Sequence, residues 1–210
     1  MTAPAPRLVA ASVALLIGLA ALTGCTDSAP DAAPAAGSTS TPTPSVDPDD
    51  TLWRVTSTDE RLPLEDPDVQ ELQKVVALHS GVSDNRSPAT VRASVAAEEE
   101  SFAPLFLERL SGQGYEEAVV AMYVDNDLTI EQTGVAWTPS TVDADRMHAT
   151  VGFESIFRIV SASDGFLHEL DAEAGVEVVQ PREYRLTKID GAWLIDDIEK
   201  GPLRKAQGTP

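Results

Sequence analysis

The sequence predicts an α+β domain in which N-terminal helices pack on a curved four-stranded antiparallel sheet, preceded by a signal peptide and a disordered tether. Apolar residues recur at helical spacing from Leu62 to Met122, and the apolar period changes to two from Leu128 onward. Helices followed by antiparallel strands are typical of this class. The predicted boundaries are 1–24 for the signal peptide, 25–61 for the tether with its modified cysteine, 62–200 for the domain and 201–210 for a flexible tail.

The N-terminus has the features of an export signal. Arg7 is followed by an uncharged run of apolar and small residues from Leu8 to Leu22. This run is shorter than the ~20 residues that a membrane-spanning helix needs, but it suits the apolar region of a secretory signal. It closes on Leu22-Thr23-Gly24-Cys25, which contains the only cysteine of the chain. A single cysteine excludes a disulfide within the monomer.

This tetrapeptide resembles the lipobox of bacterial lipoproteins. The resemblance implies that the Cys25 thiol is alkylated with diacylglycerol, that the chain is cut just before it, and that the mature protein is lipid-anchored to the outer face of the cell membrane. The lipid bilayer is then the first predicted partner, and two acyl chains at ~0.8 kcal/mol per buried methylene give a stable anchor. The alternatives are a plain signal peptide with an unrelated cysteine, or an uncleaved anchor.

The segment after the cysteine is predicted to be an extended spacer. Residues 26–50 consist of Ala, Pro, Ser, Thr, Asp and Gly, with Val46 as the one larger apolar group. Such a composition buries too little surface to offset the entropy of ordering. The stretch from Ser38 to Pro44 also resembles O-glycosylated stalks, but a bare spacer is the preferred interpretation.

Helix signals begin in the segment after Leu62. Asp66 and Pro67 form an N-cap and first helical position, and Ser80-Gly81 is expected to end that helix. Its apolar face comprises Val69, Leu72, Val75 and Val76. Three further helices are expected. The first runs from Ser87-Pro88 through Ala97. The second is a short element at Pro104, with apolar residues at helical spacing at Phe102, Leu105, Phe106 and Leu110, and the third follows Gly114, with Tyr115, Ala118, Val119 and Met122 at helical spacing.

Strand signals follow. Alternation predicts one strand around Val135 and Trp137, a long one from Met147 to Ile159, a third from Val176 to Leu186 and a last one from Trp193 to Ile198. Asp143-Ala144-Asp145 reads as a hairpin turn, and Asp190-Gly191 as a type I′ turn. A polar loop with Gly165 and Gly175 is expected between the second and third strands. Trp193 is expected to be buried against Phe153 or Phe157, with Leu194 and Ile198 on the opposite face.

The closing hairpin is similar to that of a known superfamily. Residues 184–198 read YRLTKIDGAWLIDDI, a strand, a turn and an apolar-Trp-apolar strand. This resembles the last hairpin of the nuclear transport factor 2-like superfamily, and the order of elements agrees over residues 62–200. The whole chain resembles lipoproteins of unknown function from high-GC Gram-positive bacteria. The superfamily resemblance implies a cone-shaped pocket between helices and sheet. Some members are isomerases, cyclases or dehydratases and others only bind partners, so the fold does not select a function.

Charge disfavours some partners. The chain has 15 basic and 34 acidic residues, and residues 51–210 alone have 14 and 29. Such a surface repels phosphate backbones and anionic headgroups, so the sequence predicts no nucleic-acid partner and no membrane binding through a basic patch.

Candidate pocket residues are few. Asp125 and Asp127 follow Tyr123 at a helix-to-strand junction, where turn chemistry is the alternative explanation. Asp196 and Asp197 are expected on opposite faces of the last strand, so one of them faces what the sheet covers. A carboxylate in an apolar pocket would have a raised pKa and could act as a general base, with Asp196 as the candidate.

The histidines suggest no site. His79 is expected to be solvated at the end of the first helix, His148 to face outward, and His168 to lie in a loop; their separation gives no metal-ligand spacing. No catalytic residue, metal or cofactor is therefore predicted. The expected function is a non-catalytic binding or accessory module of the cell envelope, with an envelope protein as possible partner. The alternatives are an isomerase- or cyclase-like enzyme, or an accessory subunit of an envelope transport or secretion complex.

Overall fold

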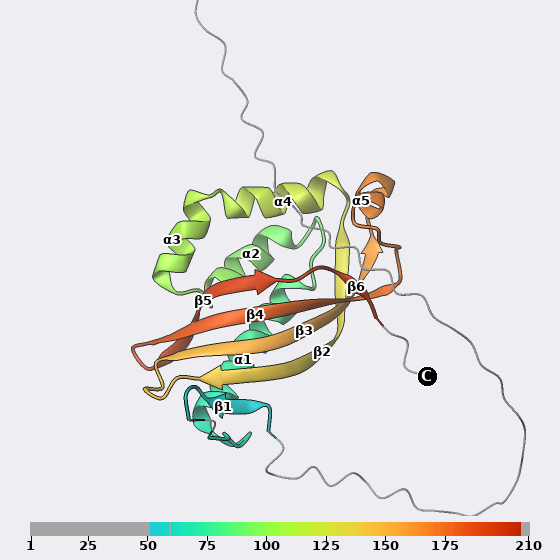
Figure 1. The fold of residues 1–210 in the computed structure, drawn as a ribbon. Helices are drawn as coiled ribbons and strands as arrows, with labels where there is room; N and C mark the ends of the chain where they lie inside the picture. The colour runs from blue at the N-terminus through green and yellow to red at the C-terminus, as the bar shows by residue number, and fades with distance from the viewer. Residues whose placement is uncertain (1–50, 59, 207–210) are drawn as a thin grey trace, which may run out of the picture. The chain divides into compact units, whose positions relative to one another are not determined.

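The computed structural model describes residues 51–58 and 60–206, which fold as an α+β domain (Figure 1). The predicted signal peptide, Cys25 and residues 26–50 of the predicted tether lie outside the described residues. No helix among those described is both long and apolar enough to cross a membrane.

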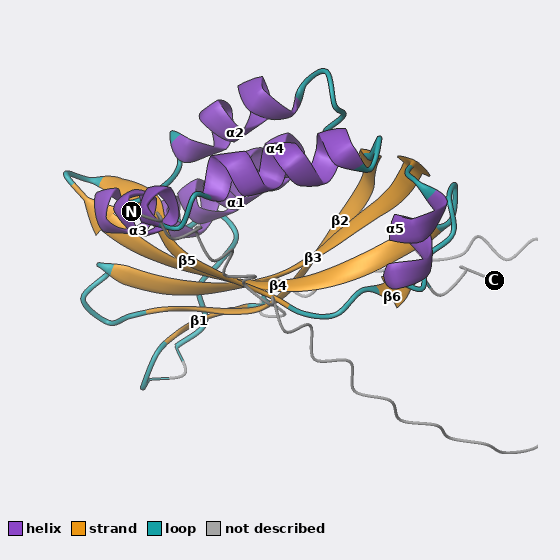
Figure 2. Cartoon of the chain, turned by 90° about the horizontal axis from the view of Figure 1, so that it is seen from above, coloured by secondary structure: helices purple, strands orange, loops and turns teal. Residues whose placement is uncertain are grey.

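Four helices precede the long strands of the sheet. They are α1 (Pro67–Ser83), α2 (Val91–Glu99), α3 (Pro104–Gly112) and α4 (Tyr115–Asp125). Figure 2 shows all four on the same face of the sheet, which curves around them. The predicted start of α1 is confirmed, because an Asp66 carboxylate oxygen accepts from the backbone amide of Asp68 at 2.9 Å. The second start signal was placed too early: α2 begins at Val91, and Ser87 instead forms a turn with Thr90.

Helix α1 continues past its predicted end. It runs through Ser80-Gly81 to Ser83, and the backbone amide of Asp84 closes the last turn by donating to the Ser80 carbonyl at 2.9 Å. An interior glycine weakens a helix by only ~1 kcal/mol relative to alanine, and the buried contacts of Ser80, Ser83 and Asp84 outweigh that cost. The additional turn brings these three polar residues beneath the sheet.

The sheet has six strands instead of the four predicted. They are β1 (Trp53–Val55), β2 (Thr129–Val142), β3 (His148–Ser161), β4 (Glu177–Ile189), β5 (Ala192–Lys200) and β6 (Arg204–Lys205). The order is β1-β2-β3-β4-β5, with β6 pairing β4 beyond the end of β5. The β2–β3 register shifts between Gln132 and Gly134 and again between Thr138 and Thr141. Such bulges bend a strand and contribute to the curvature of this sheet.

Strand β1 corrects two predictions. It pairs with β2 in parallel, so the sheet is mixed and not wholly antiparallel. Trp53 and Leu62 are 1% and 2% exposed, so the domain begins before the predicted boundary at Leu62. The sequence signal was missed because a three-residue strand shows only one step of alternation.

Two other short elements occupy segments predicted to be irregular. The loop with Gly165 contains α5 (Asp164–Glu169), whose Ser163 cap accepts from the amide of Phe166 at 3.4 Å, and His168 lies in its last turn. The predicted flexible tail contains β6, held to β4 by register pairs such as Val179 with Arg204. Both elements are too short to show a period.

The last hairpin has its predicted turn but an unexpected bulge. Asp190 and Gly191 both have positive φ angles, 52° and 87°, as a type I′ turn requires. Register pairs join Leu186 to Ile195 and Arg185 to Asp197, which leaves Asp196 as an extra residue. Alternation therefore shifts at the bulge, and Ile198 lies opposite buried Tyr184 on the inner face. The prediction that Ile198 faces outward was wrong for this reason.

The core divides into two clusters of buried apolar residues. The larger joins α1 and α3 to the sheet and includes Trp193, Phe153 and Leu72, so the predicted burial of Trp193 is confirmed. The smaller joins α2 and α4 to the far end of β3 through residues such as Val95, Tyr123 and Ile159. The larger cluster borders a layer of buried polar side chains, where the candidate site lies.

Candidate functional site

A cavity of about 370 Å³ opens between the end of α1, helix α3, the start of α4 and strand β5. Its volume is within the range of small-molecule sites. Aromatic, apolar and charged side chains share its wall. They are His79, Phe102, Phe106, Arg109, Leu110, Gln113, Tyr115, Asp197, Ile198 and Lys200.

Lys200 is on the inner face of β5. It pairs in register with Arg182 of β4, two residues beyond the Tyr184–Ile198 pair that faces the core. No hydrogen-bond or ion-pair partner of its ammonium exists in the part of the chain that the structure describes. Burial among protein atoms, followed by the charge of Arg182, lowers the pKa of Lys200 to about 8. The residue as a whole is nevertheless exposed, so solvent screens part of this desolvation.

The second cation of the cavity is already paired. Arg109 donates from Nη2 to Asp197 Oδ1 at 2.8 Å, and its guanidinium lies 4.9 Å from the centre of the Phe106 ring. Arg185 also approaches Asp197, at 3.6 Å. The charge of Asp197 is therefore compensated by two arginines.

His79 is buried, which corrects the prediction of a solvated imidazole. Its side chain packs beside Phe102, and its Nδ1 lies 3.2 Å from the Tyr184 hydroxyl. Burial, followed by the positive charges of Lys200 and Arg182, lowers the pKa of His79 to about 3. The ring is therefore neutral at physiological pH. Helical spacing could have revealed this, since His79 lies three residues after Val76 on the apolar face of α1.

Behind His79, Asp84 and Arg182 form a buried ion pair. Arg182 Nη2 donates to Asp84 Oδ1 at 2.7 Å, and both side chains are at most 4% exposed. The hydroxyls of Ser80 and Ser155 donate to Oδ2 at 3.0 and 2.6 Å. The Ser83 hydroxyl lies 3.3 Å from both Oδ1 and the Ser80 carbonyl oxygen. Burial acts to raise the pKa of Asp84, but the charge and hydrogen bonds of Arg182 and the bond from Ser155 outweigh it and lower the pKa.

A second buried ion pair lies at the base of α2. Arg86 and Glu98 are in direct contact with side chains 4% and 0% exposed, and the Tyr115 hydroxyl donates to Glu98. Arg86 also donates from Nε to the Ser94 hydroxyl at 2.6 Å. Burial, followed by the charge of Glu98, raises the pKa of Tyr115. Tyr115 therefore remains a neutral hydroxyl at the edge of the cavity.

The sequence-predicted pocket residues lie in separate places. Asp125 is exposed at the end of α4 and borders a surface cavity of about 300 Å³ between α2 and α4. Asp127 is exposed with φ at 47°, and its backbone carbonyl accepts from the Ser161 hydroxyl at 3.1 Å. Asp196 is exposed at the β5 bulge, while its neighbour Asp197 lines the cavity beside α3.

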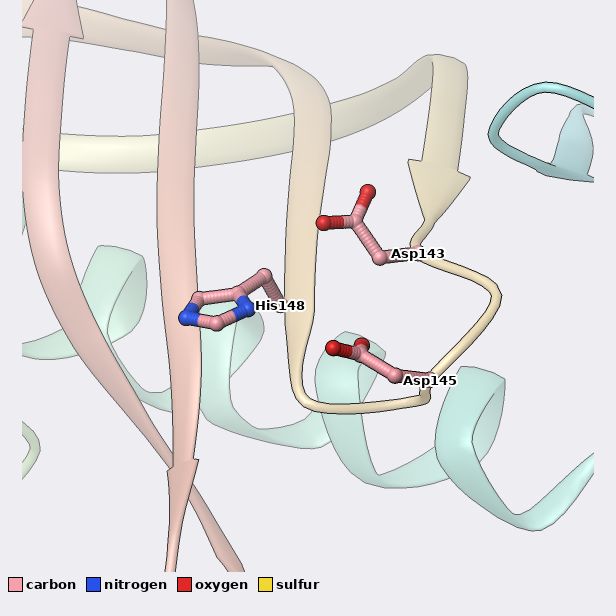
Figure 3. A group of neighbouring side chains, drawn as sticks. All are labelled: Asp143, Asp145 and His148. Atoms are coloured by element: carbon pink, nitrogen blue, oxygen red, sulfur yellow. The ribbon is translucent and has the colours of Figure 1, made fainter.

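One group of metal-ligating side chains was missed. The β2–β3 turn brings ligand atoms of Asp143, Asp145 and His148 within 4.8 Å of one another (Figure 3). His148 faces outward as predicted, but Asp143 and Asp145 lie close enough to it to share a metal ion, which the spacing of the histidines alone did not indicate. Carboxylate and imidazole donors suit several divalent metals. Asp145 already accepts from the backbone amide of Met147 at 2.9 Å, and both it and His148 are exposed, so turn formation accounts for this group.

Comparisons with known proteins give no family. No family model matches the chain, and no curated protein matches it. Among solved structures, a periplasmic fragment of TraM is 11% identical with a TM-score of 0.41, covering 65% of this chain and 97% of its own. VirB8 of Agrobacterium tumefaciens is 8% identical with a TM-score of 0.40, covering 67% and 96%. The intermembrane space region of chloroplast protein ARC6 is 12% identical with a TM-score of 0.39, covering 62% and 94%.

Proposed function

We propose that this chain is a lipoprotein anchored through Cys25 to the outer face of the cell membrane. We further propose that its nuclear transport factor 2-like domain is a non-catalytic module that binds a small molecule in the cavity beside α3. The lipobox Leu22-Thr23-Gly24-Cys25 supports the anchor. The mixed aromatic and polar wall of the cavity supports ligand binding, because apolar pockets with a few placed polar groups are typical of such sites.

The state of the buried acid–base groups favours binding over catalysis. Asp84 already accepts hydrogen bonds from Arg182 on Oδ1 and from Ser80 and Ser155 on Oδ2, so the carboxylate has little capacity left for a substrate proton. His79 has a pKa of about 3, and a base this weak is poorly matched to proton abstraction near neutral pH. The one observation that carries the proposal is therefore a cavity beside which the buried carboxylate of Asp84 and the imidazole of His79 have structural roles.

The cavity is tested with phenylbutanol, a neutral probe with an aromatic body. Phenylbutanol should raise the melting temperature of the full-length protein in a concentration-dependent way, because a ligand that binds only the native state stabilises it. Gln113→Trp places an indole at the wall of the cavity and should abolish the shift. Gln70→Trp, on the exposed side of α1, should leave it unchanged. Absence of any shift in the wild type, or an equal shift in Gln113→Trp, would contradict the proposed site.

The anchor is tested by Cys25→Ala. The wild type should partition into membranes and require detergent for release, whereas the variant should be unprocessed or released without detergent. Membrane partitioning and cleavage identical to the wild type would overturn the lipobox interpretation.

A further inference from the structure

We propose that the ligand of this cavity is a small organic anion with an apolar body, and that Lys200 is the residue that binds its charge. The inference rests on the proposed function, because it concerns the same cavity and names the chemical class of its ligand.

The charges around the cavity are paired except for one. Asp197 pairs with Arg109 at 2.8 Å, Asp84 with Arg182 at 2.7 Å, and Glu98 contacts Arg86. These three carboxylates each have an arginine. Lys200 is the fourth cation of the group, and within residues 60–206 no carboxylate forms an ion pair with it.

This unpaired ammonium stands out because the domain is so acidic. Residues 51–210 contain 29 acidic and 14 basic side chains, so an acidic partner for an inward-facing lysine would be easy to supply. Other lysines of the same sheet do have such partners: exposed Lys205 pairs with Glu173 at 3.0 Å, and partly buried Lys188 with Asp68. Burial, followed by the charge of Arg182, lowers the pKa of Lys200 to about 8, and the more distant charges of Asp84 and Glu98 only partly oppose this.

The walls of the cavity determine the rest of the ligand. Phe102 and Phe106 meet edge to face with ring centres 4.9 Å apart, and Leu110 and Ile198 complete an apolar surface. Such a surface favours an aromatic or branched apolar body. Lys200 presents a single point charge and no planar fork, and the nearby guanidiniums are occupied by carboxylates. A monoanion such as a carboxylate therefore suits the cavity better than a phosphate dianion.

The test uses three probes that share one apolar body: phenylbutyrate, phenylbutanol and phenylbutylamine. Affinity is measured from the concentration dependence of the melting temperature of the full-length protein. Phenylbutyrate should bind about tenfold more tightly than phenylbutanol, as a charge-assisted hydrogen bond allows, and phenylbutylamine should bind more weakly than either. Lys200→Gln should remove the preference for phenylbutyrate while leaving phenylbutanol binding unchanged. Lys200→Arg should retain it, and Lys205→Gln, which removes one exposed charge, should behave as the wild type.

The outcomes separate this inference from the proposed function. Equal binding of the alcohol and the carboxylate, or an unchanged preference in Lys200→Gln, would overturn the role of Lys200 and leave the cavity intact as a binding site. Failure of all three probes would overturn both. Stronger binding of the amine would show that the cavity selects cations and would contradict the inference directly.

Discussion

Asp84 and Arg182 are separated by 98 residues in the chain and meet in an ion pair of 2.7 Å behind the cavity. Asp84 caps the last turn of α1, and Arg182 projects from the inner face of β4. The pair therefore holds the end of the first helix against the sheet. His79 lies directly before this turn and lines the cavity, so this contact also positions one wall of the cavity.

Breaking this pair should be costly. Arg182→Met leaves a buried carboxylate without its cation, and we expect the free energy of unfolding to fall by ~3–5 kcal/mol. The double variant Asp84→Leu/Arg182→Met should lose less, because no uncompensated charge remains buried. Urea denaturation followed by tryptophan fluorescence measures both. Arg158→Met, which breaks an exposed pair with Glu131, is the control and should have a much smaller effect. Equal losses in Arg182→Met and Arg158→Met would show that the Asp84–Arg182 pair is not buried in solution.

His79 should make stability depend on pH. Its pKa is about 3 in the folded protein against an ordinary value of 6.5, so between these values the unfolded state binds more protons. Stability therefore rises with pH through this window and falls as the pH drops below 6.5, by ~2 kcal/mol between pH 7 and pH 5. The pKa of Asp84 is also lowered, but its contribution is complete above about 3.8 and is lost only below that value.

The measurement is the urea midpoint from pH 5 to pH 7. His79→Phe should lose less stability across this range than the wild type does. His148→Gln, which changes an exposed histidine, should keep the wild-type profile. If His79→Phe and the wild type have parallel profiles, the imidazole is solvated, as the sequence had suggested.

Trp193 should be a principal contributor to stability. It is 1% exposed within the larger core cluster, and its Nε1 donates to Asp68 Oδ1 at 3.1 Å. Trp193→Ala should lower the free energy of unfolding by ~3–5 kcal/mol, with the denaturant slope unchanged. Met147→Ala, at a side chain 43% exposed, is the control and should change it little. A wild-type midpoint for Trp193→Ala would contradict its burial.

Limited proteolysis should locate the start of the domain. The Leu52 carbonyl accepts from the Ser140 amide at 2.9 Å, and Trp53 is buried, so the resistant fragment should begin at or before Leu52. Trp53→Ala should move the first cleavage towards Leu62, whereas Leu52→Ala, at a side chain 43% exposed, should not. Mass spectrometry of the fragments gives the boundary. A wild-type fragment beginning at Leu62 would show that β1 does not protect the chain.

Much of the secondary structure was predictable because its signals are local. The Asp66-Pro67 start of α1 and the positive φ angles at Asp190-Gly191 depend on residues within one turn of the chain. The long strands β3 and β4 contain enough alternating apolar and polar residues to be predicted from the sequence. Strand β1, helix α5 and strand β6 have three, six and two residues, and such segments are too short to show a period.

The site was harder to predict because its contacts are distant in sequence. Alternation placed Asp196 and Asp197 on opposite faces, but the bulge in β5 shifts the pattern, so that Ile198 joins Tyr184 on the inner face. Ser80-Gly81 was expected to end α1, but the helix continues to Ser83 and brings Ser80, Ser83 and Asp84 beneath the sheet beside His79. Lys200 had no signal of its own, since nothing in a local pattern shows that a lysine lacks an acidic partner.

The sequence by itself determined the α+β class, the apolar face of α1, the hairpin turns and the burial of Trp193. The predicted faces of α3 and α4 were partly wrong, because Leu105 and Met122 are 77% and 40% exposed. Capping, turn angles and apolar periodicity are interactions between near neighbours, so a linear pattern records them. Only the tertiary structure decided which polar residues meet: His79 with Tyr184 across 105 residues, and Asp84 with Arg182 across 98. These pairings depend on strand register and on how far α1 extends, and both are set by packing of the whole domain, which short segments do not encode.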